Sequence, residues 1–101
     1  MTIEDLSQTE LQEKIEEAEE FLVELYAPWC SPCKQLIHWV ENNLDNLSVP
    51  VYKANIEKIP EIVGTLNIRS VPTVLYVVDG QIKDIQVAQK GKELIEKFLK
   101  G

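Results

Sequence analysis

Two cysteines, Cys30 and Cys33, are the residues of this 101-residue chain whose type and spacing most directly indicate chemistry. A disulfide exchanger needs one ionised, reachable thiol and a second thiol close enough to resolve the mixed disulfide. Two intervening residues meet both needs at the start of a helix, where free amide groups and the helix dipole stabilise a thiolate. We therefore predict that Cys30, the outermost, is the nucleophile and that Cys33, more buried, is the resolving thiol.

The residues around the two cysteines favour redox chemistry over the other roles of paired thiols. Pro32 suits the first turn of a helix, and Trp29 offers a flat apolar surface beside the nucleophile. A zinc site needs about four ligands, which the two cysteines and the single His38 cannot supply within one chain. A structural disulfide is not expected in a reducing compartment. The alternatives that stay open are a metal site that bridges two chains and a pair of unreactive thiols near a helix start.

The elements that must position this pair follow from the hydrophobic pattern and belong to the α/β class. Strands joined by helices run parallel, whereas the Asp79-Gly80 turn joins an antiparallel hairpin. We expect a mixed sheet of four to five strands with helices on both faces. The predicted helices cover residues 7–19, 31 to about 47, 60–66 and 92–100, and the strands cover 21–27, 49–56, 73–78 and 81–87, with a further short strand at 2–4.

Composition and charge restrict the class of partner. The chain has 17 acidic and 10 basic residues and a net charge of −7, which argues against a nucleic-acid or anionic-membrane surface. No apolar run approaches the roughly 18 residues of a membrane span, and residues 1–20 lack the pattern of a secretory signal. We expect one domain over residues 1–101, a monomer, in the cytoplasm.

Residues 21–34, FLVELYAPWCSPCK, resemble the active-site strand, loop and helix start of thioredoxins. The likeness continues through NIRSVPTVLYVVDGQI and KELIEKFL, so it covers nearly the whole chain from Phe21 onward. The resemblance implies a thioredoxin fold and a cis-proline at Pro72 that lies against the dithiol. It also implies that the backbone of Val71 pairs with an extended client segment, on a docking surface formed by Trp29, Ser70, Val71 and Ala88.

Glu24 stands alone as an acid inside the first predicted strand, where burial without a partner raises a carboxyl pKa. The resemblance aligns Glu24 with an acid, typically Asp, that lies beneath the dithiol, and Lys53 with the lysine that partners this acid. Our hypothesis is that Glu24 takes the proton from Cys33, directly or through water, as that thiol attacks. The alternative is an outward-facing Glu24 satisfied by solvent.

Several positions depart from the pattern of the family. Ser31 replaces a glycine, Tyr26 stands where tryptophan or another aromatic is usual, and His38 occupies the place of a proline that bends the active-site helix. Ala88 stands where a glycine usually lets a partner approach, and the loop that follows is about two residues shorter. These last two departures concern the choice of client and reductase rather than the chemistry.

The sequence therefore predicts a protein-disulfide reductase without a bound cofactor, whose partners are disulfide-bearing clients. The resemblance implies that its electrons come from NADPH through a thioredoxin reductase. Pro32 favours this interpretation, because oxidising and isomerising members commonly carry histidine there. A thiol oxidase or isomerase and a non-catalytic binding module are the alternatives, and a Cys30→Ser variant would separate the last from a redox enzyme.

Overall fold

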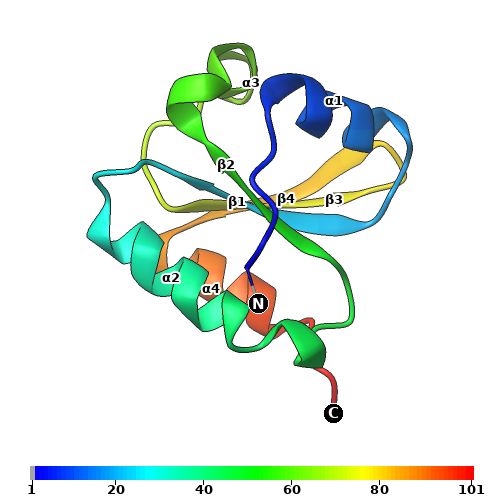
Figure 1. The fold of residues 1–101 in the computed structure, drawn as a ribbon. Helices are drawn as coiled ribbons and strands as arrows, with labels where there is room; N and C mark the ends of the chain where they lie inside the picture. Colours follow the sequence, from blue (N-terminus) through cyan, green and yellow to red (C-terminus); the bar gives the residue numbers. More distant parts are fainter. Residues whose placement is uncertain (1) are drawn as a thin grey trace.

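The computed structural model describes residues 2–101, so Met1, where the predicted domain begins, lies outside the described residues. Within this range the chain forms four strands, four α-helices and two short 3-10 turns (Figure 1). In chain order these elements are α1 (Gln8–Glu16), β1 (Phe21–Tyr26), α2 (Ser31–Glu41), η1 (Leu44–Asn46), β2 (Val51–Asn55), η2 (Ile56–Lys58), α3 (Pro60–Leu66), β3 (Thr73–Val78), β4 (Gln81–Val87) and α4 (Ala88–Glu96). None of the helices between residues 2 and 101 is long and apolar enough to cross a bilayer.

The four strands form one mixed sheet in the order β2-β1-β3-β4. Strand β1 pairs in parallel with β2 and antiparallel with β3, and β3 pairs antiparallel with β4. Strand β1 is central and buried on both faces, which explains its nearly continuous apolar sequence. The predicted strand at residues 2–4 is absent from the described structure. Instead, the backbones of Glu4 and Leu6 hydrogen-bond to Lys53 of β2, so that Asp5 forms an isolated parallel bridge with Lys53.

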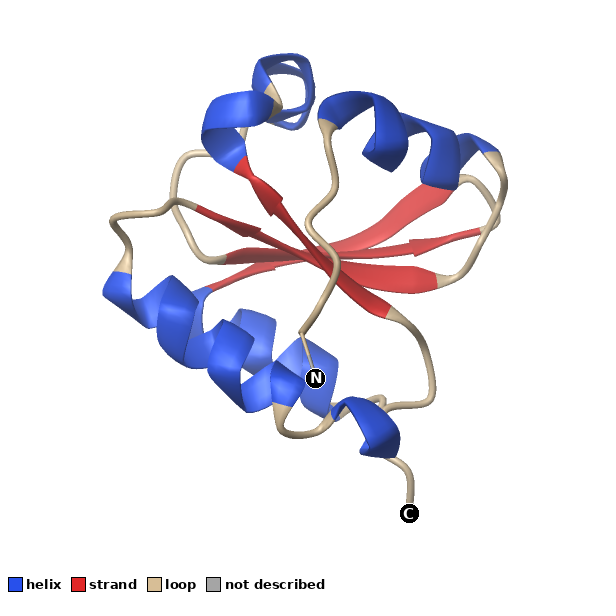
Figure 2. Ribbon diagram, in the orientation of Figure 1, coloured by secondary structure: helices blue, strands red, loops and turns tan. Residues whose placement is uncertain are grey.

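Helices α1 and α3 cover one face of the sheet, and α2 and α4 cover the other (Figure 2). Side chains alternate between the faces along β1, so that Leu22 packs in the α2–α4 cluster and Val23 in the α1–α3 cluster. Glu24, two residues after Leu22, therefore projects toward the α2–α4 side. This register places one acidic side chain beneath the helix that carries both cysteines.

Three helices end earlier than the hydrophobic pattern predicts, and one of them is α4, which ends at Glu96 rather than near residue 100. Helix α1 has the predicted capping box, with hydrogen bonds of 2.9 and 3.1 Å between Ser7 and Glu10, but it ends at Glu16. Ala18, which the periodicity assigned to the helix, instead has a left-handed φ of 58° and breaks it. Helix α2 ends at Glu41, and Leu47 reaches the core through the separate turn η1.

Helix α4 begins four residues earlier than predicted, because β4 leads directly into it at Ala88. Ala88 adopts a left-handed φ of 50°, and its amide donates to the carbonyl of Pro72 at 2.9 Å. Gly91 then lets the helix lie close to β3, since a Cβ at this position would lie 2.9 Å from the Val74 Cγ2 atom. The predicted loop between the last strand and the last helix is therefore wrong, and α4 closes directly onto the sheet.

Candidate redox site

Cys30 and Cys33 form a disulfide at the N-terminus of α2. Cys30 is the N-cap residue, and its sulfur accepts a hydrogen bond of 3.2 Å from the backbone amide of Cys33. Pro32 occupies the first turn, where its missing N–H leaves no helical bond unmade. In the reduced protein the same amide and the helix dipole would stabilise a thiolate on Cys30.

The environment of the two sulfurs differs in the direction expected from the sequence. Cys30 is 5% exposed and Cys33 is fully buried. Trp29 is 70% exposed beside them, and its indole N–H donates to the Glu57 carboxylate at 3.2 Å. The site is therefore a slightly exposed cysteine, with a second, fully buried cysteine behind it and an exposed indole at its edge.

The segment before β3 approaches the disulfide from the other side. The Val71–Pro72 peptide bond is cis, as the resemblance implied, and the Val71 carbonyl oxygen lies 3.9 Å from the Cys30 sulfur. Exposed Ser70 accepts a hydrogen bond of 2.6 Å from the Thr73 hydroxyl through its carbonyl. The structure thus brings Val71 and Pro72 against the dithiol, with Ser70 next to them in the same segment.

A shallow hollow of about 170 Å³ lies on this side of the dithiol. Pro72 and exposed Ala88 form part of its wall, together with Pro32, Gln35, Leu36, Gln89 and Lys92. Trp29 is not one of its lining residues. The predicted docking residues therefore do not form one continuous wall, because Trp29 is tied to Glu57 and Ala88 belongs to this hollow.

Glu24 is fully buried, as its place in the first strand predicted, which excludes the alternative of an outward-facing side chain satisfied by solvent. Neither carboxyl oxygen has a hydrogen-bond partner among the described residues. Burial raises the pKa of Glu24 to about 8, and the positive charge of Lys53 opposes this rise only in part. Most molecules therefore carry a protonated Glu24 at pH 7, and the group titrates near neutral pH.

Lys53 lies directly opposite Glu24 in the parallel β1–β2 register. No ion pair joins the two side chains in the described part of the chain. The Lys53 ammonium instead lies 5.6 Å from the centre of the Tyr26 ring, whose hydroxyl donates to Asp5. The partnership of Lys53 with the buried acid is thus a longer-range charge interaction rather than a salt bridge.

A second hollow, of about 350 Å³, lies between α2 and the adjoining ends of β1 and β2. Its lining residues include Tyr26 and Lys53 and the exposed His38, together with Ala27, Pro28, Lys34, Ile37 and Glu41. Sequence reasoning missed Lys34, although it follows Cys33 directly, and it missed Glu41 and Glu57, which the tertiary fold brings to the site. No group of three or more His, Cys, Asp or Glu side chains within residues 2–101 is arranged to hold a metal ion.

This fold and a disulfide at the N-terminus of α2 define a thiol–disulfide oxidoreductase with a Cys-X-X-Cys centre. The sequence model of the thioredoxin family, described as "Thioredoxin", matches residues 2–101, and the chain belongs to that family. The membership and the cysteine pair support protein-disulfide reduction, and they do not favour the oxidase, isomerase or binding-module alternatives.

Individual relatives agree with the family assignment. A thioredoxin of Rickettsia bellii is 42% identical over 74% of this chain and 74% of its own. The chloroplastic M-type thioredoxin of Spinacia oleracea is 33% identical over 96% of this chain, which spans 58% of that protein. The solved thioredoxin of Plasmodium falciparum is 27% identical, with a TM-score of 0.81, over 95% of this chain and 99% of that one. These likenesses extend over the fold as well as the cysteine motif.

Proposed function

We propose that this protein reduces disulfides of client proteins and is recharged with electrons from NADPH through a thioredoxin reductase. The observation that carries the proposal is the Cys30–Cys33 disulfide, whose outer sulfur accepts the Cys33 amide at the helix start. The two cysteines of the chain pair with each other, so the protein can alternate between this disulfide and a dithiol. A cytoplasmic monomer suits this role, because a reducing compartment keeps the dithiol ready for the next client.

The reaction is two successive thiol–disulfide exchanges. The Cys30 thiolate attacks one sulfur of the client disulfide, forms a mixed disulfide and releases the other client sulfur as a thiolate. Cys33 then loses its proton and attacks the Cys30 sulfur, which forms the Cys30–Cys33 bond and releases the second client thiolate. The client gains two electrons and the protein loses two, and the released thiolates take protons from water or from Glu24.

Glu24 is the group proposed to accept the proton of Cys33. It lies on the sheet face that α2 covers, and its two oxygens have no other hydrogen-bond partner within residues 2–101. With a pKa of about 8, the carboxyl is ionised in a minority of molecules at pH 7, and in these it can accept the proton of Cys33. Lys53, opposite Glu24, favours the ionised form and so limits the cost of this exchange.

Docking is proposed to use the segment that lies against the dithiol. The Val71 carbonyl is close to the Cys30 sulfur, so an extended client segment that paired with this backbone would present its disulfide to Cys30. Ser70 and Trp29 are exposed beside this position, and Ala88 borders the adjoining hollow.

Two cysteine variants test the proposed order of events. Cys33→Ser should accumulate a mixed disulfide between Cys30 and a disulfide-bonded client, detected by mass spectrometry, whereas Cys30→Ser should accumulate none. The opposite result would reverse the two roles. A reduction potential at or below about −250 mV at pH 7 supports a reductase, whereas a value near −180 mV would indicate isomerase-like chemistry. Turnover with NADPH and a thioredoxin reductase tests the proposed electron source.

A further inference from the structure

We propose that the hollow between α2 and the β1–β2 ends, here called the α2–β2 hollow, binds a carboxylate side chain of the client. The occupant is an aspartate or glutamate close to the client disulfide, so the protein favours acidic disulfide segments. The inference rests on the proposed reductase function and adds the chemical class of client to it. The α2–β2 hollow consists of Tyr26, Ala27, Pro28, Lys34, Ile37, His38, Glu41 and Lys53.

The position of the α2–β2 hollow suits a segment that is docked on Cys30. Pro28 lies two residues before Cys30, and Lys34 follows Cys33 directly on α2. The volume of about 350 Å³ exceeds that of the 170 Å³ hollow beside Pro72. The α2–β2 hollow is lined by Pro28 and Lys34 and the smaller hollow by Pro32 and Pro72, so the two lie on opposite sides of the dithiol. A client segment that spans the site would place the residues on one side of its disulfide over the α2–β2 hollow.

The charges that border the α2–β2 hollow are mainly positive. Lys34 from α2 and Lys53 from β2 both line it, and neither ammonium forms an ion pair among residues 2–101. Glu41 is the carboxylate in the wall, and one of its oxygens already accepts the Ile3 amide at 3.1 Å. Two unpaired ammonium groups at one hollow stand out in a chain whose net charge is −7.

Glu24, next to Lys53 in the sheet, does not cancel this positive charge at pH 7. Its burial keeps most of the population protonated, because its pKa is raised to about 8. The Lys53 ammonium is thus left to interact with a group in the α2–β2 hollow. A client carboxylate would gain a charge-assisted hydrogen bond from either lysine and would be attracted before contact.

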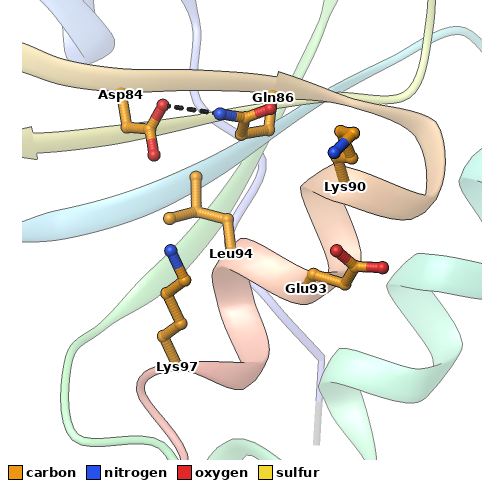
Figure 3. A pocket seen from close by; sticks show the side chains of 6 residues that line it. All are labelled: Asp84, Gln86, Lys90, Glu93, Leu94 and Lys97. Atoms are coloured by element: carbon orange, nitrogen blue, oxygen red, sulfur yellow. Dashed lines mark hydrogen bonds between the residues drawn. The ribbon is translucent and has the colours of Figure 1, made fainter.

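The hollow between β4 and α4 shows what an ordinary polar hollow on this protein contains (Figure 3). Lys90 and Lys97 line it, but Asp84 and Glu93 line it too, so its formal charges balance. Lys97 follows the end of α4, about 13 Å along the helix from Ala88 beside the dithiol. Lys97 therefore offers a matched control for the removal of one positive charge away from the site.

The test uses three short peptides that differ at one residue beside an intramolecular disulfide: glutamate, glutamine or lysine. Stopped-flow fluorescence gives the second-order rate constant for their reduction by the pre-reduced protein at pH 7 and low salt. We expect the glutamate peptide to react about two- to fivefold faster than the glutamine peptide and the lysine peptide to react more slowly. Lys34→Gln should reduce the glutamate-to-glutamine ratio by half or more, and Lys97→Gln should leave it unchanged.

The ratio separates docking from chemistry, because any effect of Lys34 on the reactivity of Cys30 acts on all three peptides alike. A ratio near one in the unaltered protein would overturn the carboxylate subsite. An equal loss in Lys97→Gln would also overturn it, since it would indicate a general field rather than a local site. The glutamine peptide tests the proposed function separately: if it is not reduced, the reductase assignment fails whatever the ratio.

Discussion

The ionisation of Glu24 should govern how the stability of this protein depends on pH. The side chain is fully buried, and its pKa rises from an ordinary value of 4.5 to about 8 on folding. The folded state therefore binds this proton more tightly than the unfolded state does. Its contribution to stability is fully present below the unfolded pKa and is lost progressively as the pH rises through about 8.

The size of the effect follows from the shift. Each pKa unit corresponds to about 1.4 kcal/mol, so the shift to about 8 amounts to about 5 kcal/mol, of which about 4 kcal/mol falls between pH 5 and pH 9. Glu24→Gln keeps the shape of the protonated acid and cannot ionise, so its free energy of unfolding should not show this loss. The free energy of unfolding of the variant minus that of the unaltered protein should therefore rise by about 4 kcal/mol from pH 5 to pH 9.

Guanidinium unfolding of the oxidised proteins at pH 5, 7 and 9 measures this difference. Glu93→Gln, at an exposed carboxylate of α4, is the control for removing one acidic group and should follow the unaltered protein. A constant offset between Glu24→Gln and the unaltered protein across the three pH values would refute the reasoning. It would mean that water or a structural change satisfies the ionised carboxylate inside the folded protein.

Three further predictions concern α4 and the α2–β2 hollow. Ala88→Gly should raise the free energy of unfolding by about 1 kcal/mol in urea titrations, because Ala88 holds a left-handed φ of 50°; a loss of stability would contradict this. Gly91→Ala should lower the free energy of unfolding by about 1–3 kcal/mol in the same titrations, because its Cβ would meet Val74 at 2.9 Å; an unchanged midpoint would show that α4 can shift freely. The preference for the glutamate peptide should fall between pH 7 and 9 in the unaltered protein, because ionised Glu24 neutralises Lys53, and it should not fall in Glu24→Gln. The measurement is the glutamate-to-glutamine rate ratio at both pH values, and an equal fall of this ratio in the two proteins would contradict the reasoning.

The central elements of the fold were predictable because their signals are local. The apolar run from Phe21, the Asp79-Gly80 turn and the capping box at Ser7 each specify a structure within a few residues. Two of the errors lie where the backbone takes a left-handed conformation at a residue with a side chain. Ala18 and Ala88 both do so, and alanine carries no sequence signal for such a turn. The end of α1 and the start of α4 were therefore misplaced.

At the redox site, too, the features specified by neighbouring residues were predictable and the contacts between distant residues were not. Cys30 and Cys33 are close in sequence, so their placement at a helix start followed from the motif and its prolines. The burial of Glu24 also followed from its strand, although its lack of an ion pair with Lys53 did not. The Trp29–Glu57 and Tyr26–Asp5 contacts join residues 28 and 21 positions apart, and only the tertiary fold specifies them.

The same tertiary contacts connect the chemistry of the site with its choice of partner. Glu24 and Lys53 face each other across β1 and β2, and Lys53 also lines the α2–β2 hollow. A proton that enters or leaves Glu24 therefore changes the net charge that an approaching client meets at this hollow. In the proposed mechanism, a molecule whose Glu24 is ionised gains a proton on that carboxylate when Cys33 attacks, which leaves its Lys53 charge uncompensated at the moment when the client is released. A carboxylate held by Lys53 would then be retained longest, so release rather than attack is the step that this pair of residues should slow for acidic clients.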